Sequence, residues 1–212
     1  METCPPIIRR VKRFPLRLNS MTLLSLDRNL HQSNLNKIIL NMEIAVYPNP
    51  VLKTKAKPIE EIDSEICQIA EEMLDTLYDA CGVGLAAPQV GLSIRLVVLD
   101  ITGEKTGERV FINPRIIEER GETVEEEGCL SFPDVMGNII RSQYVKVTAY
   151  NLKGEQLEIE AEGLLSRAWQ HEIDHLNGCL FIDKMTPAST IANKPKLKEL
   201  EMSYQNSKAG VS

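Results

Sequence analysis

Hydrophobic residues recur every three or four positions in two stretches of the chain, and this spacing predicts two amphipathic helices. The first stretch is IDSEICQIAEEMLDTLYDACG, residues 62–82. Asp63 or Ser64 is suited to cap its start, and Gly82 is suited to end it. The second stretch is GLLSRAWQHEIDHLNG, residues 163–178.

Other stretches carry the signals of β-strands. IRLVVLDI (94–101) and RVFINPRII (109–117) are rich in β-branched residues, and Pro114 predicts a sheet edge or a bulge. YVKVTAY and EQLEIEAEG alternate apolar and polar residues on either side of NLKG, which predicts a hairpin. GVGLAAPQVGL (82–92) is typical of a glycine-rich loop. Strands together with two helices indicate an α+β fold.

Composition narrows the class of protein. The chain has 212 residues, of which 43% are apolar and 25% charged, as in an ordinary globular domain. It contains no apolar run of the roughly 20 residues that a membrane helix needs. The net charge is −6, and residues 42–212 alone carry −11, which argues against a nucleic-acid substrate. Five cysteines without a CxxC pair favour free thiols in a reducing compartment.

The first 41 residues differ from the rest, with a charge of +5 and no clear periodicity. They are consistent with an organelle-targeting segment, a disordered tail, or an upstream artefact of a misassigned start, since Met42 opens a plausible domain. A secretory signal fits least, because no sustained apolar segment follows the charges. We expect a non-core basic extension over 1–41, a catalytic domain over 42–185, and a polar C-terminal tail, in part helical, over 186–212.

Two of the three histidines lie four residues apart in HEIDH, residues 171–175. Residues at this spacing share one helix face, so His171 and His175 can bind one divalent metal ion. Glu172 is then placed to take a proton from a metal-bound water. The structural alternative is a pair of histidines that interact with the negative end of a helix dipole.

A catalytic metal site needs a third protein ligand and one open position. No histidine follows His175, and Glu199 and Glu201 lie in a Lys-rich segment typical of a solvated surface helix. Upstream, Cys129 in EEEGCLSFP offers a thiolate, which is a strong ligand. The remaining cysteines of the domain, Cys67, Cys81 and Cys179, are expected to serve in packing.

Three motifs together resemble the signatures of peptide deformylases. They are GVGLAAPQ (82–89), EGCLS (127–131) and QHEIDHLNG (170–178), and their order and separation also match. The resemblance covers about residues 42–185, and FPDVMGNIIR (132–141) is similar to type I, 1B-like members from plastids and several bacteria. It implies an α+β fold in which antiparallel or mixed sheets pack around a central helix that carries HExxH.

The resemblance also implies a mechanism. Cys129, His171 and His175 would hold one divalent ion, usually Fe²⁺ in the family, with Zn²⁺ or Ni²⁺ also compatible. Glu172 would move a proton from water to the leaving amine, and the Gln89 side chain and Leu130 N–H would stabilise the oxyanion. The formyl group of an N-formylmethionyl chain would leave as formate. Without the resemblance, Gln89 reads as a turn residue that faces solvent.

The resemblance further implies contacts and partners. Val83, Gly84 and Gly128 would bind the substrate, although these glycines are equally consistent with tight turns. Glu127 and Arg141 would form an ion pair that braces the cysteine motif, which matters only if the pair is buried.

The expected partner is the nascent formyl-methionyl polypeptide, met at the ribosome, with no nucleic-acid substrate and no membrane. We expect a monomer in a bacterial cytoplasm, or in a plastid or mitochondrion if residues 1–41 are a transit segment. Two alternatives are a HExxH zinc endopeptidase, disfavoured by the missing downstream ligand, and a non-catalytic metal-binding domain.

Overall fold

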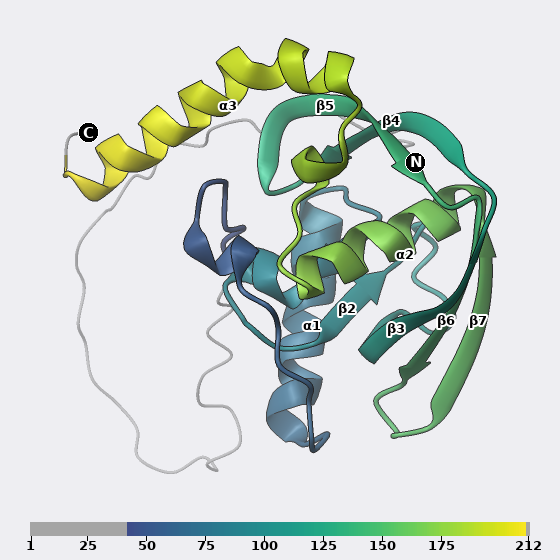
Figure 1. Ribbon diagram of the computed structural model, residues 1–212. Coiled ribbons are helices and arrows are strands. Elements are labelled where there is room, and N and C mark those ends of the chain that lie inside the picture. The colour runs from purple at the N-terminus through teal and green to yellow at the C-terminus, as the bar shows by residue number, and fades with distance from the viewer. Residues whose placement is uncertain (1–41, 211–212) are drawn as a thin grey trace, which may run out of the picture.

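The computed structural model of the protein describes residues 42–210. Within this range, seven strands form two sheets and three α-helices pack around them (Figure 1). The expected α+β class is confirmed. The helices are α1 (Ser64–Asp79), α2 (Gly163–Leu176) and α3 (Pro187–Lys208). The strands are β1 (Gly84–Ala86), β2 (Leu96–Leu99), β3 (Val110–Arg120), β4 (Thr123–Cys129), β5 (Phe132–Arg141), β6 (Tyr144–Tyr150) and β7 (Gln156–Glu162).

The strands pair antiparallel throughout. One sheet has five strands in the order β1-β2-β3-β6-β7, and β4 and β5 form a separate two-stranded sheet. The helix α2 lies between these two sheets (Figure 1). The pairing of β3 with β6 shifts register between Ile112 and Arg115, so Pro114 marks a bulge. It does not mark an edge, because β3 has a neighbour on each side.

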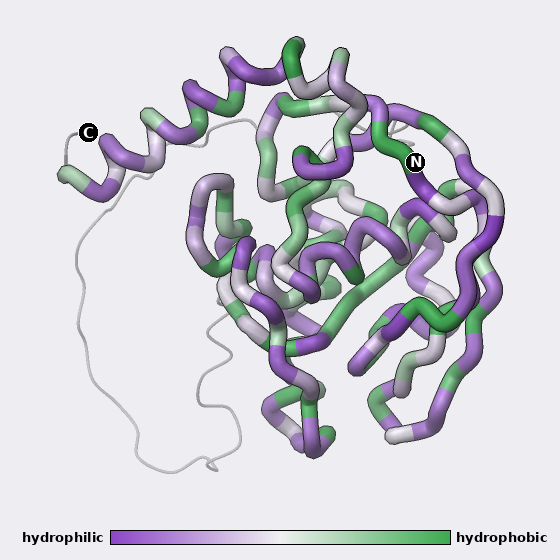
Figure 2. The backbone as a smooth tube through the Cα atoms, in the orientation of Figure 1, coloured by the Kyte–Doolittle hydropathy of each residue, from purple (hydrophilic) through white to green (hydrophobic). Residues whose placement is uncertain are grey.

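The short strand β2 explains how the two main helices are placed. Consecutive side chains of a strand point to opposite faces. Leu96 and Val98 pack with α1 in one cluster, whereas Val97 and Leu99 pack with α2 in another. All four residues are buried, so the strand reads as a continuous apolar run. The strongly hydrophobic stretch through the centre of Figure 2 is this strand.

Both predicted helices form where the periodicity places them. The Asp63 carboxylate caps α1 by accepting the Ile66 N–H at 2.9 Å, and the helix ends at Asp79. On α2, Trp169 packs edge-on against Phe111 of β3, with ring centroids 4.7 Å apart. Beyond its end Gly178 has φ +73°, where a Cβ would lie 2.6 Å from the Lys53 carbonyl oxygen, so only glycine fits.

Two expectations from the sequence are wrong. Residues 82–92 do not form a simple glycine-rich loop, because Gly84–Ala86 pairs with Val97–Leu99 as β1 and a 3₁₀ turn follows over Ala87–Val90. Cys81 and Cys179 do not pack in the core but are exposed. Each follows the last turn of a helix, where the helical periodicity no longer determines which way a side chain points.

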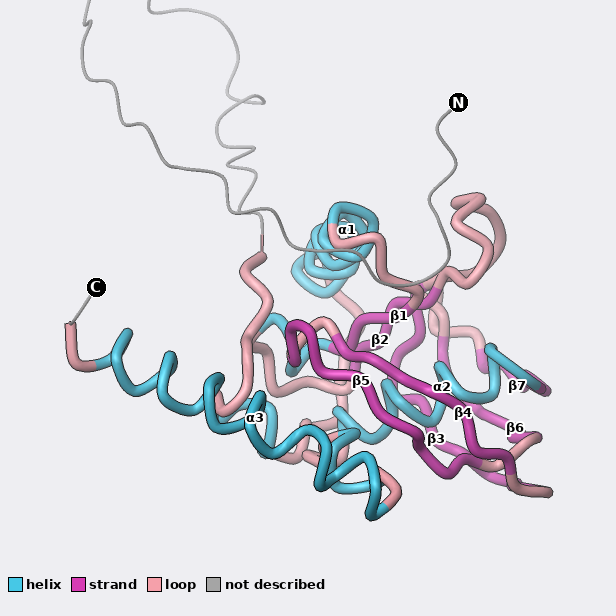
Figure 3. Tube along the Cα trace, turned by 90° about the horizontal axis from the view of Figure 1, so that it is seen from above, coloured by secondary structure: helices cyan, strands magenta, loops and turns pink. Residues whose placement is uncertain are grey.

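The C-terminal segment forms α3, which runs along the outside of the β4–β5 sheet (Figures 1 and 3). Thr186 caps its start, and Asn193 donates to the Met136 carbonyl of β5 at 2.7 Å. Polar residues dominate the helix (Figure 2). Glu201 accepts a hydrogen bond from the Tyr47 hydroxyl at 2.7 Å, and burial together with this carboxylate raises the pKa of Tyr47 to about 12. No helix in the described part of the chain is long and apolar enough to cross a membrane.

The buried stripe of α1 predicts the cost of a cavity. Leu77 is fully buried, so Leu77→Ala is expected to lower the free energy of unfolding by about 2–5 kcal/mol. Leu164 is 43% exposed, and Leu164→Ala is the matched control, with an expected change of about 0.5 kcal/mol. Urea unfolding of the two variants measures the difference. Equal effects would contradict the packing of α1.

Candidate active site

Three metal-ligating side chains converge where the end of β4 meets α2. Cys129 is the last residue of β4, and His171 and His175 project from one face of α2. One ligand atom from each of the three lies within 4.8 Å of the other two. The Cys129 Sγ atom is 3.3 Å from His175 Nε2, and the two imidazole centroids are 5.0 Å apart.

A buried carboxylate orients one of these histidines. Glu127 Oε2 lies 3.1 Å from His171 Nδ1, which leaves the opposite ring nitrogen to face the centre of the site. Arg141 donates to both oxygens of Glu127 at 3.0 Å, and Arg167 donates to Oε1 at 2.6 Å. Arg141 also donates to Asp174 Oδ2. The Glu127–Arg141 ion pair suggested by the sequence is therefore buried.

The charges of this network hold each other in the ionised state. Burial by itself raises the pKa of Glu127, but hydrogen bonds from His171 and Arg141 outweigh it and hold that pKa well below its usual range. Burial acts to lower the pKa of Arg141, and Glu127 and Asp174 together raise it. The Glu127 carboxylate therefore stays ionised at neutral pH. It can thus hold the His171 ring in a fixed orientation.

The two histidines lie in different environments. Burial lowers the pKa of His175 well below its usual value, and the nearby charges of His171 and Arg141 add to this effect, which favours the neutral ligand form. Burial opposes protonation of His171, but Cys129, Glu127 and Glu172 raise its pKa well above the usual value. A divalent cation among the three donors would act in the opposite sense on His171 and favour its neutral form.

Glu172 lies in the same enclosed space. Glu172 is 3% exposed, and its Oε2 atom has no hydrogen-bond partner among the described residues. Burial raises the pKa of Glu172 to about 7, against the opposing effect of His171 and Arg141. A pKa near neutrality suits a group that both accepts and donates a proton. Gly84 makes room for this side chain, since a Cβ there would lie 2.5 Å from Glu172 Oε1.

Gln89 also points into the site and does not face solvent. It is 1% exposed, its Oε1 atom accepts the Ala86 N–H at 2.8 Å, and its Nε2 atom lies 3.5 Å from Cys129 Sγ. The bond to Ala86 fixes which end of the amide is the donor. Gln89 does lie in a turn, the 3₁₀ turn Ala87–Val90, but the expectation that its side chain faces solvent is wrong, because its amide N–H groups are directed towards Cys129.

The remaining predicted residues lie around this centre. Leu130 occupies the tight turn between β4 and β5, directly after Cys129. Val83 precedes β1, the edge strand of the five-stranded sheet, and its carbonyl accepts the Asp100 N–H at 2.9 Å. Gly128 pairs with Met136, and a Cβ at Gly128 would lie 2.6 Å from the Met136 sulfur, so a larger residue there would require the Met136 side chain to move.

The residues present fit a divalent metal ion. One thiolate and two imidazoles form a donor set suited to Fe²⁺, Zn²⁺ or Ni²⁺. The unpartnered Glu172 Oε2 adds a second indication, because a buried carboxylate oxygen without a partner is costly unless a ligand or water meets it. The three donor atoms and the unpartnered Glu172 oxygen lie close together next to α2.

Sequence reasoning missed two residues of this network, Arg167 and Asp174. Both sit on α2, four positions before His171 and one before His175, so a charged residue on the helix that carries HExxH was the available signal. In an amphipathic helix such residues normally read as a solvated face. Every residue of α2 from Ser166 to Leu176 is buried, which turns these charges into structural partners.

Comparison with known proteins identifies the family and the fold. The polypeptide deformylase family matches residues 41–190. The chain belongs to the polypeptide deformylase family. It is 46% identical over 160 residues to a peptide deformylase of Chromobacterium violaceum, covering 76% of this chain and 96% of the relative. A relative from Halothermothrix orenii is 51% identical over 144 residues, covering 68% and 93%.

Solved structures of deformylases agree. The peptide deformylase of Plasmodium falciparum superposes with a TM-score of 0.74 at 39% identity, covering 77% of this chain and 97% of that one. Peptide deformylase 1B of Arabidopsis thaliana in complex with an inhibitor gives 0.76 at 38% identity, covering 80% and 94%. The resemblance found in the three motifs is thus confirmed.

Deformylases remove the formyl group from the N-terminal formylmethionine of newly made polypeptides, so this chain is a metal-dependent amide hydrolase. The metal dependence of the family agrees with the three converging ligand atoms. The endopeptidase and non-catalytic alternatives are not supported.

Removing the charge of Glu127 tests the brace. Glu127→Gln removes the buried anion that Arg141 and Arg167 share, and leaves Arg141 paired with Asp174 alone and Arg167 with the exposed Glu125 at 3.6 Å, so we expect a loss of about 3 kcal/mol in unfolding free energy. Metal affinity should fall about 10–100-fold as His171 loses its partner. Denaturant unfolding and competition with a chelator measure the two effects. Glu126→Gln, at the exposed neighbouring residue, is the control. Equal unfolding free energies and equal metal affinities of the two variants would show that Glu127 does not stabilise the site.

Gly84→Ala tests the space around Glu172. The new methyl group would lie 2.5 Å from Glu172 Oε1 and must displace that side chain. A displacement on this scale is expected to lower kcat about 10²-fold. Metal content should stay unchanged, because the three ligands are not touched. Steady-state formate release and metal analysis of the purified variant check both statements, and unaltered kcat would mean that Glu172 tolerates the shift.

Proposed function

We propose that Cys129, His171 and His175 hold one divalent ion and that Glu172 transfers the proton that deformylation requires. This proposal rests on one observation: three possible ligand atoms lie within 4.8 Å of one another, beside the buried Glu172 carboxylate, whose Oε2 atom has no hydrogen-bond partner among the described residues. A bound ion of this kind supplies a water of lowered pKa as a nucleophile near neutral pH.

Glu172 acts first as a base and then as an acid. It accepts a proton from the attacking water, while a bond forms between the water oxygen and the formyl carbon. The bond from that carbon to the methionine nitrogen then breaks, and Glu172 donates the proton to the departing amine. The products are formate and a free α-amine. The pKa of Glu172, raised to about 7 by burial, supports both steps.

Gln89 and Leu130 stabilise the negative charge that develops on the formyl oxygen. The Gln89 amide is fixed by its bond to the Ala86 N–H, so its N–H groups are preorganised next to Cys129. The Leu130 N–H follows Cys129 directly in the tight turn after β4. A preorganised donor of this kind is worth about 3 kcal/mol of transition-state stabilisation.

The substrate chain binds next to β1. This strand is an edge of the five-stranded sheet, so an extended peptide can pair with the backbone at Val83 and Gly84. The Val83 carbonyl is already paired with Asp100, which leaves other backbone groups of the segment for the peptide. Gly128 lies on β4, between the buried Glu127 and Cys129, and is the residue we propose to contact the substrate from that side.

Iron is the ion we propose for the protein in the cell, with Zn²⁺ or Ni²⁺ able to take its place in the same donor set. We further propose that the protein is a monomer that meets its substrate at the ribosome. Its compartment is the cytoplasm of a bacterium, or a plastid or mitochondrion if residues 1–41 act as a transit segment. N-terminal sequencing of the mature protein distinguishes these compartments.

Two substitutions separate metal binding from proton transfer. Cys129→Ala removes a ligand, so bound metal and formate release from a formyl-methionyl peptide should both be lost. Glu172→Gln keeps the three ligands, so metal should remain while kcat falls by about 10²–10⁴-fold. The assays are metal analysis and formate release under anaerobic conditions, since iron next to a thiolate oxidises readily.

Cys67→Ala is the matched control, because Cys67 lies on α1, away from the site, and this variant should keep both metal and activity. Metal retained by Cys129→Ala, or full activity of Glu172→Gln, would refute the assignment of these roles.

A further inference from the structure

A pocket of about 590 Å³ lies on the opposite side of α2 from the metal ligands. Gln170, Ile173, Asp174 and Asn177 form its α2 wall, and they point away from the face that carries His171 and His175. The bulged part of β3 at Arg115 and Ile116 forms a second wall. None of the three metal ligands lines this pocket, so it is separate from the catalytic centre.

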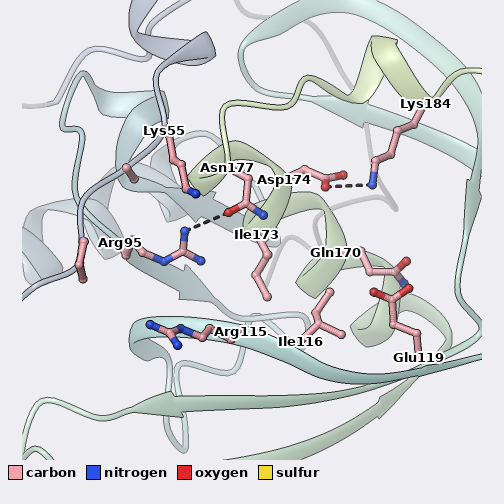
Figure 4. A pocket seen from close by; sticks show the side chains of 12 residues that line it. Lys55, Arg95, Arg115, Ile116, Glu119, Gln170, Ile173, Asp174, Asn177 and Lys184 are labelled. Atoms are coloured by element: carbon pink, nitrogen blue, oxygen red, sulfur yellow. Dashed lines mark hydrogen bonds and ion pairs between the residues drawn. The ribbon is translucent and has the colours of Figure 1, made fainter.

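Three cationic side chains gather at one end of the pocket. Figure 4 shows Lys55, Arg95 and Arg115 there, close to Asn177, with Glu119 and Gln170 at the other end. Each cation comes from a different segment of the chain. The protein as a whole is acidic, whereas this end of the pocket is lined by three cationic side chains.

These cations have no acidic partners. Within residues 42–210, no carboxylate lies within 4.0 Å of the charged groups of Lys55, Arg95 or Arg115. Arg95 is only 8% exposed and donates to neutral acceptors, the Pro114 carbonyl at 2.8 Å and Asn177 Oδ1 at 3.0 Å. Burial and the charge of Arg115 lower the pKa of Arg95, as expected where positive charge is not compensated.

The acidic groups of the pocket are engaged elsewhere. Asp174 pairs with Arg141 on the side of the metal site and with Lys184 at 3.0 Å. Glu119 accepts the Ser142 hydroxyl at 2.8 Å at the far end. Between the two ends, Ile116 and Ile173 provide an apolar surface (Figure 4). The pocket therefore combines a free positive end with a non-polar middle, and its volume exceeds that of an inorganic ion.

We propose that this pocket binds a small organic anion, whose phosphate or carboxylate group is held by the exposed Lys55 and Arg115 beside the buried Arg95. A guanidinium and an ammonium group suit either kind of oxyanion. The carbon skeleton of the ligand lies along Ile116 and Ile173. This is a binding site additional to the one at which the formylated chain reacts.

Isothermal titration calorimetry of the metal-loaded enzyme at low ionic strength tests the proposal, with glycerol 3-phosphate and succinate as separate probes. We expect saturable binding of at least one probe, at one site per chain. In the double variant Lys55→Gln, Arg115→Gln, affinity should fall about tenfold or more, because two charge-assisted contacts are lost. Binding of only glycerol 3-phosphate, or of only succinate, assigns the site to phosphate or to carboxylate compounds.

The double variant Lys194→Gln, Lys198→Gln on α3 removes the same charge from another exposed surface and should bind like the unaltered enzyme. Both side chains of the pocket variant are exposed, so thermal unfolding and formate release should stay unchanged and show that it is folded. Three results would overturn the proposal: no binding of either probe, equal binding by the pocket variant, or an equal loss in the α3 variant. Binding that survives in the pocket variant would place the anion at another position, such as the metal centre.

Discussion

The buried carboxylate of Glu127 holds the catalytic centre together. It lies on β4, two residues before Cys129, and accepts hydrogen bonds from α2 through Arg167 and His171 and from β5 through Arg141. These contacts join the β4–β5 sheet to the helix that carries the other two proposed metal ligands, His171 and His175. A charge removed from water needs this number of partners, and the partners fix its position. The distance between Cys129 and the two histidines therefore depends on the contacts of Glu127. Of the three proposed metal ligands, only His171 takes part in these contacts.

Much of the fold follows from local patterns in the sequence. The spacing of apolar residues and the Asp63 cap predict α1, and the alternation on either side of NLKG predicts the β6–β7 hairpin. The strand β1 could not be predicted in this way. It has three residues, all buried, and begins at a glycine, so it shows neither alternation nor β-branched residues. Its pairing with β2 depends on tertiary contacts that the sequence does not display.

The site shows the same division between local and distant contacts. Helical spacing places His171 and His175 on one face, but nothing local selects Cys129, which is 46 positions from His175. The sequence offered the Cys129 thiolate as a candidate third ligand, and the resemblance of three motifs then singled it out. Arg167 and Asp174 were missed for a related reason. A charged residue on an amphipathic helix usually faces water, and only the packing of α2 between two sheets buries these two against Glu127 and Arg141.

From Ser166 to Leu176 every residue of α2 is buried, so the charged residues on both sides of this helix need partners. A helix enclosed between sheets must pair its charged residues or expose them in a cavity. On the face towards β4 the charges are paired in the network of Glu127, and His171 and His175 lie with Cys129 as a set that could hold a metal ion. On the opposite face Asp174 is neutralised by Lys184 and Arg141, so the cations beyond it at Arg95 and Arg115 are not compensated by the helix. Asp174 thus takes part in both environments: its pairing with Arg141 supports the metal side, and the same pairing prevents it from balancing the positive end of the pocket.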